Sequence, residues 1–143
     1  MFLSRVRTSQ GMSVLYHLAP APAWRKCREK GEAYFPDTYA SDGFIHLTEK
    51  AELLLPVANH FYKDDPRTWL LLVLDATKLK AEVKMEPAAD VGTTKTKTFD
   101  PNAKEEALFP HLYGTIDYES VTQEVQIERD VATGEFLSFP GLQ

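Results

Sequence analysis

The sequence predicts a single α+β domain, because its apolar pattern places two short helices early and most strands late. One strand and one helix alternate twice, and strands then follow one another. Strands and helices that are segregated in this way favour α+β over a doubly wound parallel sheet. The length of 143 residues suits one hydrophobic core.

The first predicted strand covers residues 14–18, where Tyr16 and His17 face opposite sides. A helix is predicted to begin at Pro22 and to end just before Gly31. Proline suits the first turn of a helix, and glycine suits the position just after its end.

The second predicted strand covers residues 44–47 and follows a polar loop, residues 37–42, that ends in a turn. Phe44 and His46 share one face of this strand because side chains alternate along an extended chain. His46 is therefore expected at the end of a strand, just before a helix, where functional sites are often built.

A second helix is predicted from residue 49 to about residue 61, with Thr48 as its cap. Apolar residues recur there at helical spacing. Pro56 lies inside this pattern, so it is expected to kink or split the helix, unless it opens a second segment.

The second half of the chain is predicted to contain mainly strands. Residues 69–74 are almost continuously apolar, as in a central strand that is buried on both faces. Residues 88–106 are expected to form a long, irregular and mobile surface loop, since they lack apolar periodicity. Further strands are predicted at residues 82–86 and, after the segment that contains His111, at residues 121–127 and 135–137.

Composition narrows the class of protein. The net charge of −5 and scattered acidic residues argue against general nucleic-acid binding, and no run is long enough to span a membrane. Residues 1–12 are expected to be a disordered leader, with a weak targeting arm as the alternative. The single cysteine, Cys27, excludes an intramolecular disulfide and favours a cytoplasmic protein.

Three of the four histidines, His17, His46 and His111, lie in short apolar segments. One interpretation is that each is an ordinary buried imidazole. The other is that they converge in one cleft with Phe44 and Tyr113, where neutral imidazoles would contact a ligand and the aromatic rings would pack against it.

Three segments together resemble the family called domain of unknown function 952. They are YHL at residues 16–18, DGFIHLT at 42–48 and FPHLYG at 109–114. The resemblance covers roughly residues 13–127, although the loop before the third segment looks long and Pro56 interrupts the second helix.

The resemblance implies a split-sheet fold distantly similar to the ADP-ribosyltransferase superfamily, in which NAD lies between two small sheets. In that pattern a first-strand polar residue holds the NAD ribose, and His17 matches it by position. Later residues pack on nicotinamide, and a late glutamate organises the ribose. The candidate catalytic residues are then His17, His46, Glu86 and Glu119, and the candidate ligand-binding residues are Ser41, Phe44, His111 and Tyr113.

The enzyme hypothesis is transfer or hydrolysis at the glycosidic carbon of NAD, with NAD as a substrate and no certain cofactor. The alternatives are a non-catalytic module that binds a nucleotide or another small molecule, and a histidine-based metal site. The sequence lacks local pairs such as His-x-x-x-His, which argues against catalytic zinc. No glycine-flanked nucleophile elbow surrounds Ser41, which argues against serine hydrolysis.

Overall fold

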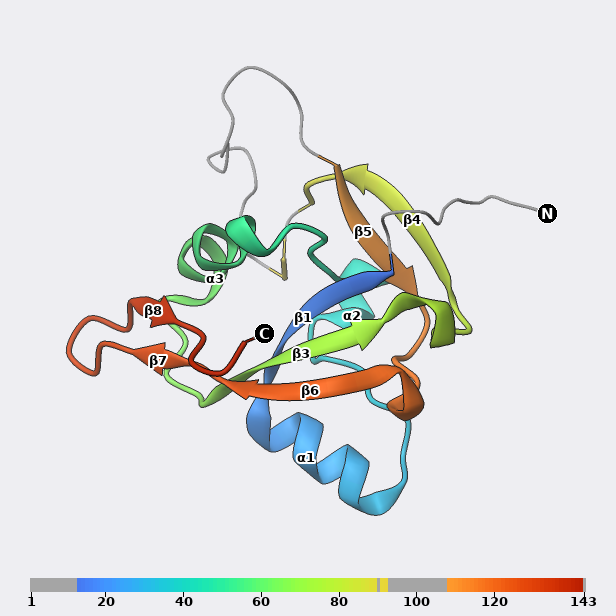
Figure 1. Ribbon diagram of the computed structural model, residues 1–143, viewed down its shortest axis with the longest axis horizontal. Helices are drawn as coiled ribbons and strands as arrows, with labels where there is room; N and C mark the ends of the chain where they lie inside the picture. The colour runs from blue at the N-terminus through green and yellow to red at the C-terminus, as the bar shows by residue number, and fades with distance from the viewer. Residues whose placement is uncertain (1–12, 90, 93–107, 143) are drawn as a thin grey trace.

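The computed structural model describes residues 13–89, 91–92 and 108–142, and it has the predicted α+β architecture (Figure 1). The strands form two small antiparallel sheets and a two-stranded hairpin. The first sheet has the order β1 (Val14–Pro20), β3 (Trp69–Asp75), β6 (Val121–Gln126). The second has the order β2 (Ile45–His46), β5 (Leu108–Tyr113), β4 (Glu82–Pro87), and β7 (Glu128–Arg129) pairs with β8 (Phe136–Ser138).

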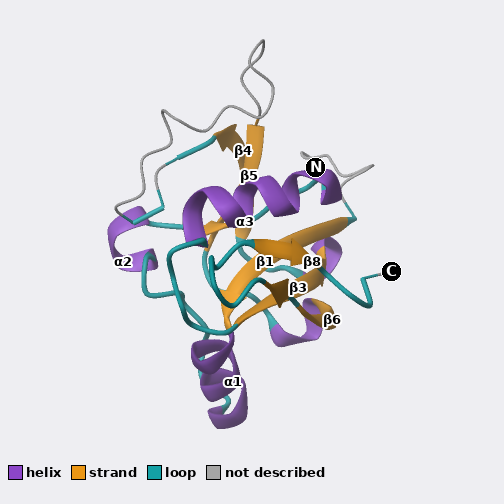
Figure 2. Ribbon diagram, turned by 90° about the vertical axis from the view of Figure 1, so that its left-hand side faces the viewer, coloured by secondary structure: helices purple, strands orange, loops and turns teal. Residues whose placement is uncertain are grey.

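Within the described residues, three α-helices and three short 3-10 helices connect these strands. Figure 2 shows α3 lying across the first sheet, with α1 beyond the end of its strands. The helices are α1 (Ala21–Lys30), α2 (Tyr39–Asp42) and α3 (Leu54–Tyr62), and the 3-10 helices are η1 (Ala51–Leu53), η2 (Ala76–Lys78) and η3 (Tyr118–Ser120).

Strand β3 is the centre of the fold, as its continuous apolar sequence predicts. Its even-numbered residues, Leu70, Leu72 and Leu74, enter a core shared with α1 and the second sheet. Trp69, Leu71 and Val73 belong to a second core beneath α3 and β8. This core also contains Leu54 of α3. Burial on both faces explains why this strand has no polar alternation.

The two sheets meet through backbone hydrogen bonds between Tyr16 and Thr48. The Tyr16 amide donates to the Thr48 carbonyl (2.9 Å), and the Thr48 amide donates to the Tyr16 carbonyl (2.8 Å). The prediction that Thr48 caps a helix is therefore wrong, because its backbone is committed to this extended pairing. The predicted strand at 44–47 is correspondingly short, with only Ile45 and His46 in β2.

The predicted second helix is divided into η1 and α3. Pro56 is the third residue of α3, where its missing amide hydrogen would have no partner inside the helix. The prediction that Pro56 opens a second helical segment is the alternative that the structure confirms. The α-helix α3 thus begins at Leu54, five residues after the predicted helix start at residue 49.

The predicted loop at residues 37–42 contains the short helix α2. Gly43 ends this helix with φ 84°, a left-handed conformation that glycine adopts without a Cβ penalty. Strand β1 also extends past its predicted end to Pro20, and β7 was not predicted.

The predicted leader, residues 1–12, and most of the predicted mobile loop, residues 93–106, lie outside the described residues. Among the described helices, none is long and apolar enough to cross a membrane.

Candidate functional site

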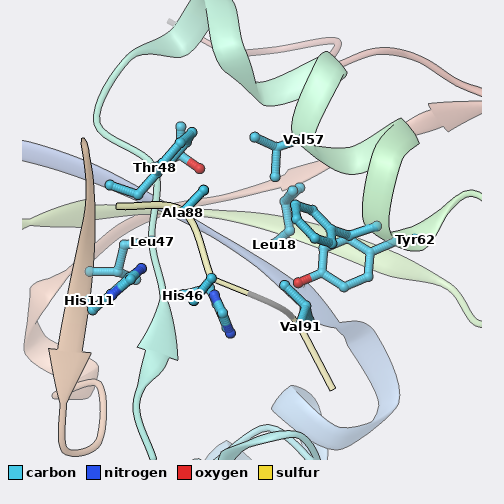
Figure 3. A pocket seen from close by; sticks show the side chains of 12 residues that line it. Leu18, His46, Leu47, Thr48, Val57, Tyr62, Ala88, Val91 and His111 are labelled. Atoms are coloured by element: carbon cyan, nitrogen blue, oxygen red, sulfur yellow. The ribbon is translucent and has the colours of Figure 1, made fainter. Parts of the chain in front are cut away.

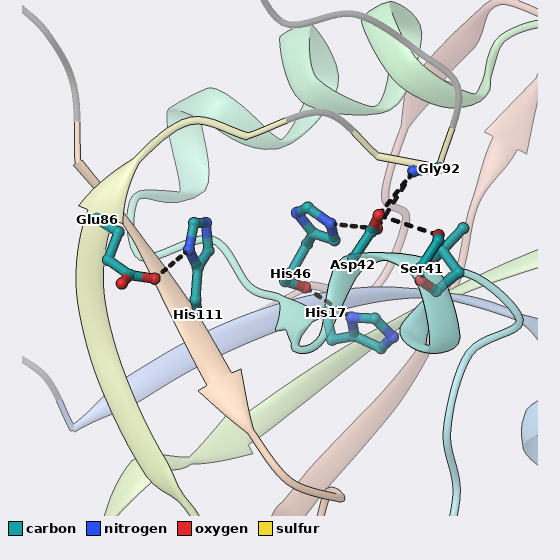
Figure 4. A network of polar contacts seen from close by, with 8 residues as sticks. His17, Ser41, Asp42, His46, Glu86, Gly92 and His111 are labelled. Atoms are coloured by element: carbon teal, nitrogen blue, oxygen red, sulfur yellow. Dashed lines mark hydrogen bonds and ion pairs between the residues drawn. The ribbon is translucent and has the colours of Figure 1, made fainter.

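His46 is paired with Asp42, which lies one turn earlier in the chain. Because Gly43 reverses the backbone after α2, the Asp42 carboxylate comes back beside the β2 strand. His46 Nε2 donates to Asp42 Oδ2 at 2.8 Å, and the Gly92 amide lies 3.2 Å from each Asp42 oxygen (Figure 4). The Asp42 side chain is only 7% exposed, so this carboxylate orients His46 in a largely dry setting.

His111 has a carboxylate partner of its own, Glu86 on the neighbouring strand β4. His111 Nδ1 donates to Glu86 Oε1 at 2.7 Å, and the Tyr113 hydroxyl donates to the same oxygen at 2.6 Å. The bond from Tyr113 is the main reason that the pKa of Glu86 is lowered, and it raises the pKa of Tyr113 to about 12. Glu86 is therefore an ionised acceptor that holds two site residues at once.

His46 and His111 are directly opposite each other in the β2–β5 pairing. Their ring centroids are 5.6 Å apart, and the planes meet at 72°. Phe44 stacks on His111 at 4.0 Å and contacts His46 at 4.7 Å, so one aromatic ring supports both imidazoles. Figure 4 shows the resulting row of side chains from Glu86 through His111 and His46 to Asp42.

Each of these two imidazoles has one protonated nitrogen and one lone pair. A carboxylate only accepts hydrogen bonds, so the protons lie on His46 Nε2 and His111 Nδ1. Burial lowers the pKa of both rings, and it outweighs the opposing effect of Asp42 and Glu86. Both rings are thus neutral near pH 7, and neither His46 Nδ1 nor His111 Nε2 bonds to a described residue.

Two hollows adjoin this pair, and His46 borders both. The larger has a volume of about 370 Å³ and includes Arg67 and Trp69. The smaller, about 30 Å³, reaches His111 and lies beneath α3 (Figure 3). The residues common to both hollows are Leu18, His46, Phe61, Tyr62 and Val91.

The expected single cleft walled by five residues is therefore divided. His17 borders only the larger hollow, and His111 borders only the smaller one. His17 is 4% exposed, and both of its ring nitrogens are bonded inside the protein. Phe44 and Tyr113 lie behind the imidazoles and line neither hollow.

The remaining predicted residues are separated. Ser41 lies at the larger hollow, and its hydroxyl donates to the Thr38 carbonyl at 3.1 Å. Glu86 joins the His111 pair, whereas Glu119 is exposed on η3 and borders neither hollow. The structure thus brings Glu86 to the paired histidines and leaves Glu119 apart.

Sequence reasoning missed three residues of this site. Asp42 could have been found from its spacing to His46 across a glycine turn. Tyr62 and Arg67 carried no local signal, because α3 and the following loop reach the hollows only through tertiary packing. Tyr62 borders both hollows, its hydroxyl makes no hydrogen bond to a described residue, and burial raises its pKa.

Arg67 lies on the rim of the larger hollow between two carboxylates. Its guanidinium donates to Asp65 at 2.7 Å and to Asp37 at 3.2 Å, and it lies 5.4 Å from the Trp69 ring centroid. The rim therefore carries two acidic groups against one basic group. In the described part of the chain, no group of three or more histidine, cysteine or acidic residues could hold a metal ion.

A model of the family described as "Protein of unknown function (DUF952)" matches residues 18–124, which include Asp42, His46, Glu86 and His111. This chain belongs to the DUF952 family. The match confirms the family resemblance and includes the segments at residues 42–48 and 109–114, whereas it includes only Leu18 of the segment at residues 16–18. A search of curated proteins found no match.

The fold also resembles that of a solved bacterial protein, CC0527 from Caulobacter crescentus. Its X-ray structure has a TM-score of 0.64 and 23% sequence identity, and the match covers 87% of this chain and 93% of CC0527. Its solution NMR structure has a TM-score of 0.54 and 22% identity, covering 85% and 90%. At this identity the likeness establishes the shared α+β fold.

Proposed function

We propose that this DUF952 protein binds NAD or a related nucleotide beside the His46–His111 pair and acts on the bond between nicotinamide and ribose. The observation that carries the proposal is the paired arrangement of two neutral imidazoles. Each is oriented by a carboxylate, and each keeps one lone pair next to a hollow. Carboxylate–histidine pairs of this kind suit general-base chemistry.

The larger hollow has the size and lining of a small-molecule site. Its volume of about 370 Å³ lies within the range of ligand pockets. Phe61, Tyr62 and Trp69 give it aromatic walls, and the Tyr62 and Trp69 rings pack together at 4.2 Å. A planar heterocycle would pack against these rings, and the Tyr62 hydroxyl would donate to it.

The chemistry at the glycosidic carbon needs a base. Nicotinamide leaves as a neutral molecule because the electrons of the broken bond neutralise its cationic ring. The incoming water or acceptor hydroxyl must lose a proton, and His46 Nδ1 can accept it. Glu86 is already bonded to His111 and Tyr113, so its role in this proposal is to orient His111.

The division into two small sheets also supports the proposal of an ADP-ribosyltransferase-like architecture. His46 lies on the second sheet, and His17 on the first sheet reaches its carbonyl. A ligand in the larger hollow would therefore contact both sheets, as expected of NAD in that fold type.

The test combines binding with product release. NAD, ADP-ribose and AMP are each added to the wild-type protein, and melting is followed together with nicotinamide formation. A ligand at about one hundred times its dissociation constant stabilises the native state by about 2.7 kcal/mol. We expect NAD to raise the melting temperature and the wild type to release nicotinamide. No stabilisation by any of the three ligands would overturn the proposal.

His46→Gln is the sharpest variant, because the glutamine amide can still donate to Asp42 but has no basic nitrogen. We expect it to fold, to bind NAD and to lose nicotinamide release. His60→Gln on α3 is the matched control, since His60 borders neither hollow. Stabilisation by NAD without nicotinamide release in any variant would instead support a non-catalytic nucleotide-binding module.

A further inference from the structure

We propose that His17 is a positioning residue for His46, acting through a buried hydrogen-bond chain that runs from Tyr34 to the His46 backbone. The sequence pattern places His17 against a ligand. Its contacts in the structure point instead to a role in holding the second sheet against the first.

The hydrogen bonds of His17 define its protonation. Its Nδ1 lies 2.8 Å from the main-chain oxygen of His46, and a carbonyl only accepts, so Nδ1 carries the proton (Figure 4). Its Nε2 lies 2.9 Å from the Tyr34 hydroxyl, which must then be the donor. Both nitrogens are occupied, and His17 is left with no polar atom for a ligand.

Tyr34 is itself held in place by ring packing and by a hydrogen bond to its main chain. Its side chain is fully buried and contacts the Trp24 ring edge-on, with centroids 5.1 Å apart. Its main-chain oxygen accepts from the Thr115 hydroxyl at 2.6 Å. The donor to His17 therefore comes from a rigid part of the core, and the His17 ring cannot rotate without breaking two bonds.

His46 needs such a support because β2 contains only two residues. Its pairing with His111 holds one side of the strand, and the bond from His17 holds the carbonyl that points toward the first sheet. The His46 ring is then directed by Asp42. Loss of the His17 bond would free the backbone from which the His46 ring projects, so the distance between the two imidazoles would vary.

Two substitutions of the same type separate positioning from simple core packing. In His17→Asn, the amide nitrogen replaces Nδ1 and can still donate to the His46 carbonyl. In His17→Gln, the amide nitrogen replaces Nε2 and faces Tyr34 instead. Both variants are polar and uncharged, so an effect of lost polarity alone would be equal in the two.

The readout is the nitrogen-15 NMR spectrum of the His46 ring, which reports its tautomer and its pKa. We expect His17→Asn to retain the wild-type His46 signals. We expect His17→Gln to change the His46 tautomer ratio and shift its pKa, while amide signals from β3 and β6 stay in place. Equal His46 signals in the two variants would overturn the proposal.

A measurement on the wild-type protein covers the case in which neither variant folds. The His17 Nδ1 proton should exchange slowly and show a coupling across the hydrogen bond to the His46 carbonyl carbon. A rapidly exchanging proton without that coupling would also overturn the proposal.

The inference depends on the proposed function only where ligand binding is concerned. If NAD stabilises the wild type, His17→Asn should keep most of the melting shift and His17→Gln should lose at least half of it. If NAD does not bind, the proposed function fails, and the NMR comparison still decides whether His17 positions His46.

Discussion

His46 and His111 face each other across the β2–β5 pairing, and their protonated nitrogens point outward to separate carboxylates. The second nitrogen of each ring, His46 Nδ1 or His111 Nε2, bonds to no described residue. The arrangement also makes the two rings chemically unequal, because Asp42 is more deeply buried than Glu86. The carboxylates Asp42 and Glu86 are therefore substituted as well as the two imidazoles when the candidate site is tested.

Replacing Asp42 with asparagine should weaken the His46 side of the pair. Asp42→Asn keeps the shape but removes the charge that opposes the effect of burial, so the pKa of His46 should fall further. One of the bonds to His46 and Gly92 should also be lost, at a cost of about 1–2 kcal/mol in unfolding free energy. Urea denaturation and an NMR titration of His46 measure both effects.

Asp64→Asn, in the exposed loop after α3, is the control and should change neither quantity. An Asp42→Asn protein with the wild-type His46 pKa would contradict the role assigned to this carboxylate.

Removing the Tyr113 hydroxyl should act on Glu86 and not on the fold. In Tyr113→Phe the strongest influence that lowers the pKa of Glu86 is gone, so that pKa should rise toward its ordinary value. His111 keeps its bond to Glu86. Carbon-13 NMR of the Glu86 carboxyl measures the shift, and an unchanged Glu86 pKa would show that Tyr113 does not donate to it in solution.

Acid should destabilise the protein through its buried histidines. Burial lowers the pKa of His17 from 6.5 to about 4, and His46 and His111 shift in the same direction. Below pH 6.5 the unfolded chain binds protons that the native state does not, so stability falls as the pH decreases toward 4. His17 alone should account for about 3 kcal/mol over this range.

The measurement is urea unfolding at several pH values across that window. His17→Asn removes the titrating group and should reduce the pH dependence. A wild-type unfolding free energy that stays constant through the window would contradict the buried, neutral state of His17.

Gly114 should not tolerate a side chain, because a Cβ there would lie 2.5 Å from the Ala81 Cβ. Gly114→Ala should therefore lower the unfolding free energy by about 1–3 kcal/mol, the scale of overpacking in a core. Ala81→Gly removes the atom in conflict, so the double variant should recover part of the loss. Chemical denaturation of the two single variants and the double variant tests this, and simple additivity of their effects would contradict it.

Local sequence patterns predicted those elements whose apolar pattern or turn residues lie within a few positions of one another. The apolar run of β3 predicted a central strand, and alternation placed Phe44 and His46 on one face, where their rings are in contact. The glycine at position 43 predicted a turn before the strand, and it provides the left-handed end of α2.

The rest depended on tertiary pairing that one sequence does not reveal. Thr48 is a residue type that often caps helices, but in the structure its backbone amide and carbonyl pair with the backbone of Tyr16. The partnership of Glu86 with His111 follows from the register of β4 against β5, and the role of Tyr62 follows from where α3 packs. His17 was predicted to contact a ligand from its position in the family pattern, and its partners in the structure, Tyr34 and His46, lie 17 and 29 residues away in sequence.

Strand β3 contributes residues to both hydrophobic cores, whereas the paired imidazoles lie on strands of the other sheet. Amides of Trp69–Asp75 should exchange with solvent only when the whole molecule unfolds, because this strand contributes to both cores. The paired imidazoles lie on β2 and β5 of the other sheet, which does not contain β3. Substitutions around the imidazoles can therefore change the candidate site while β3 keeps the chain folded.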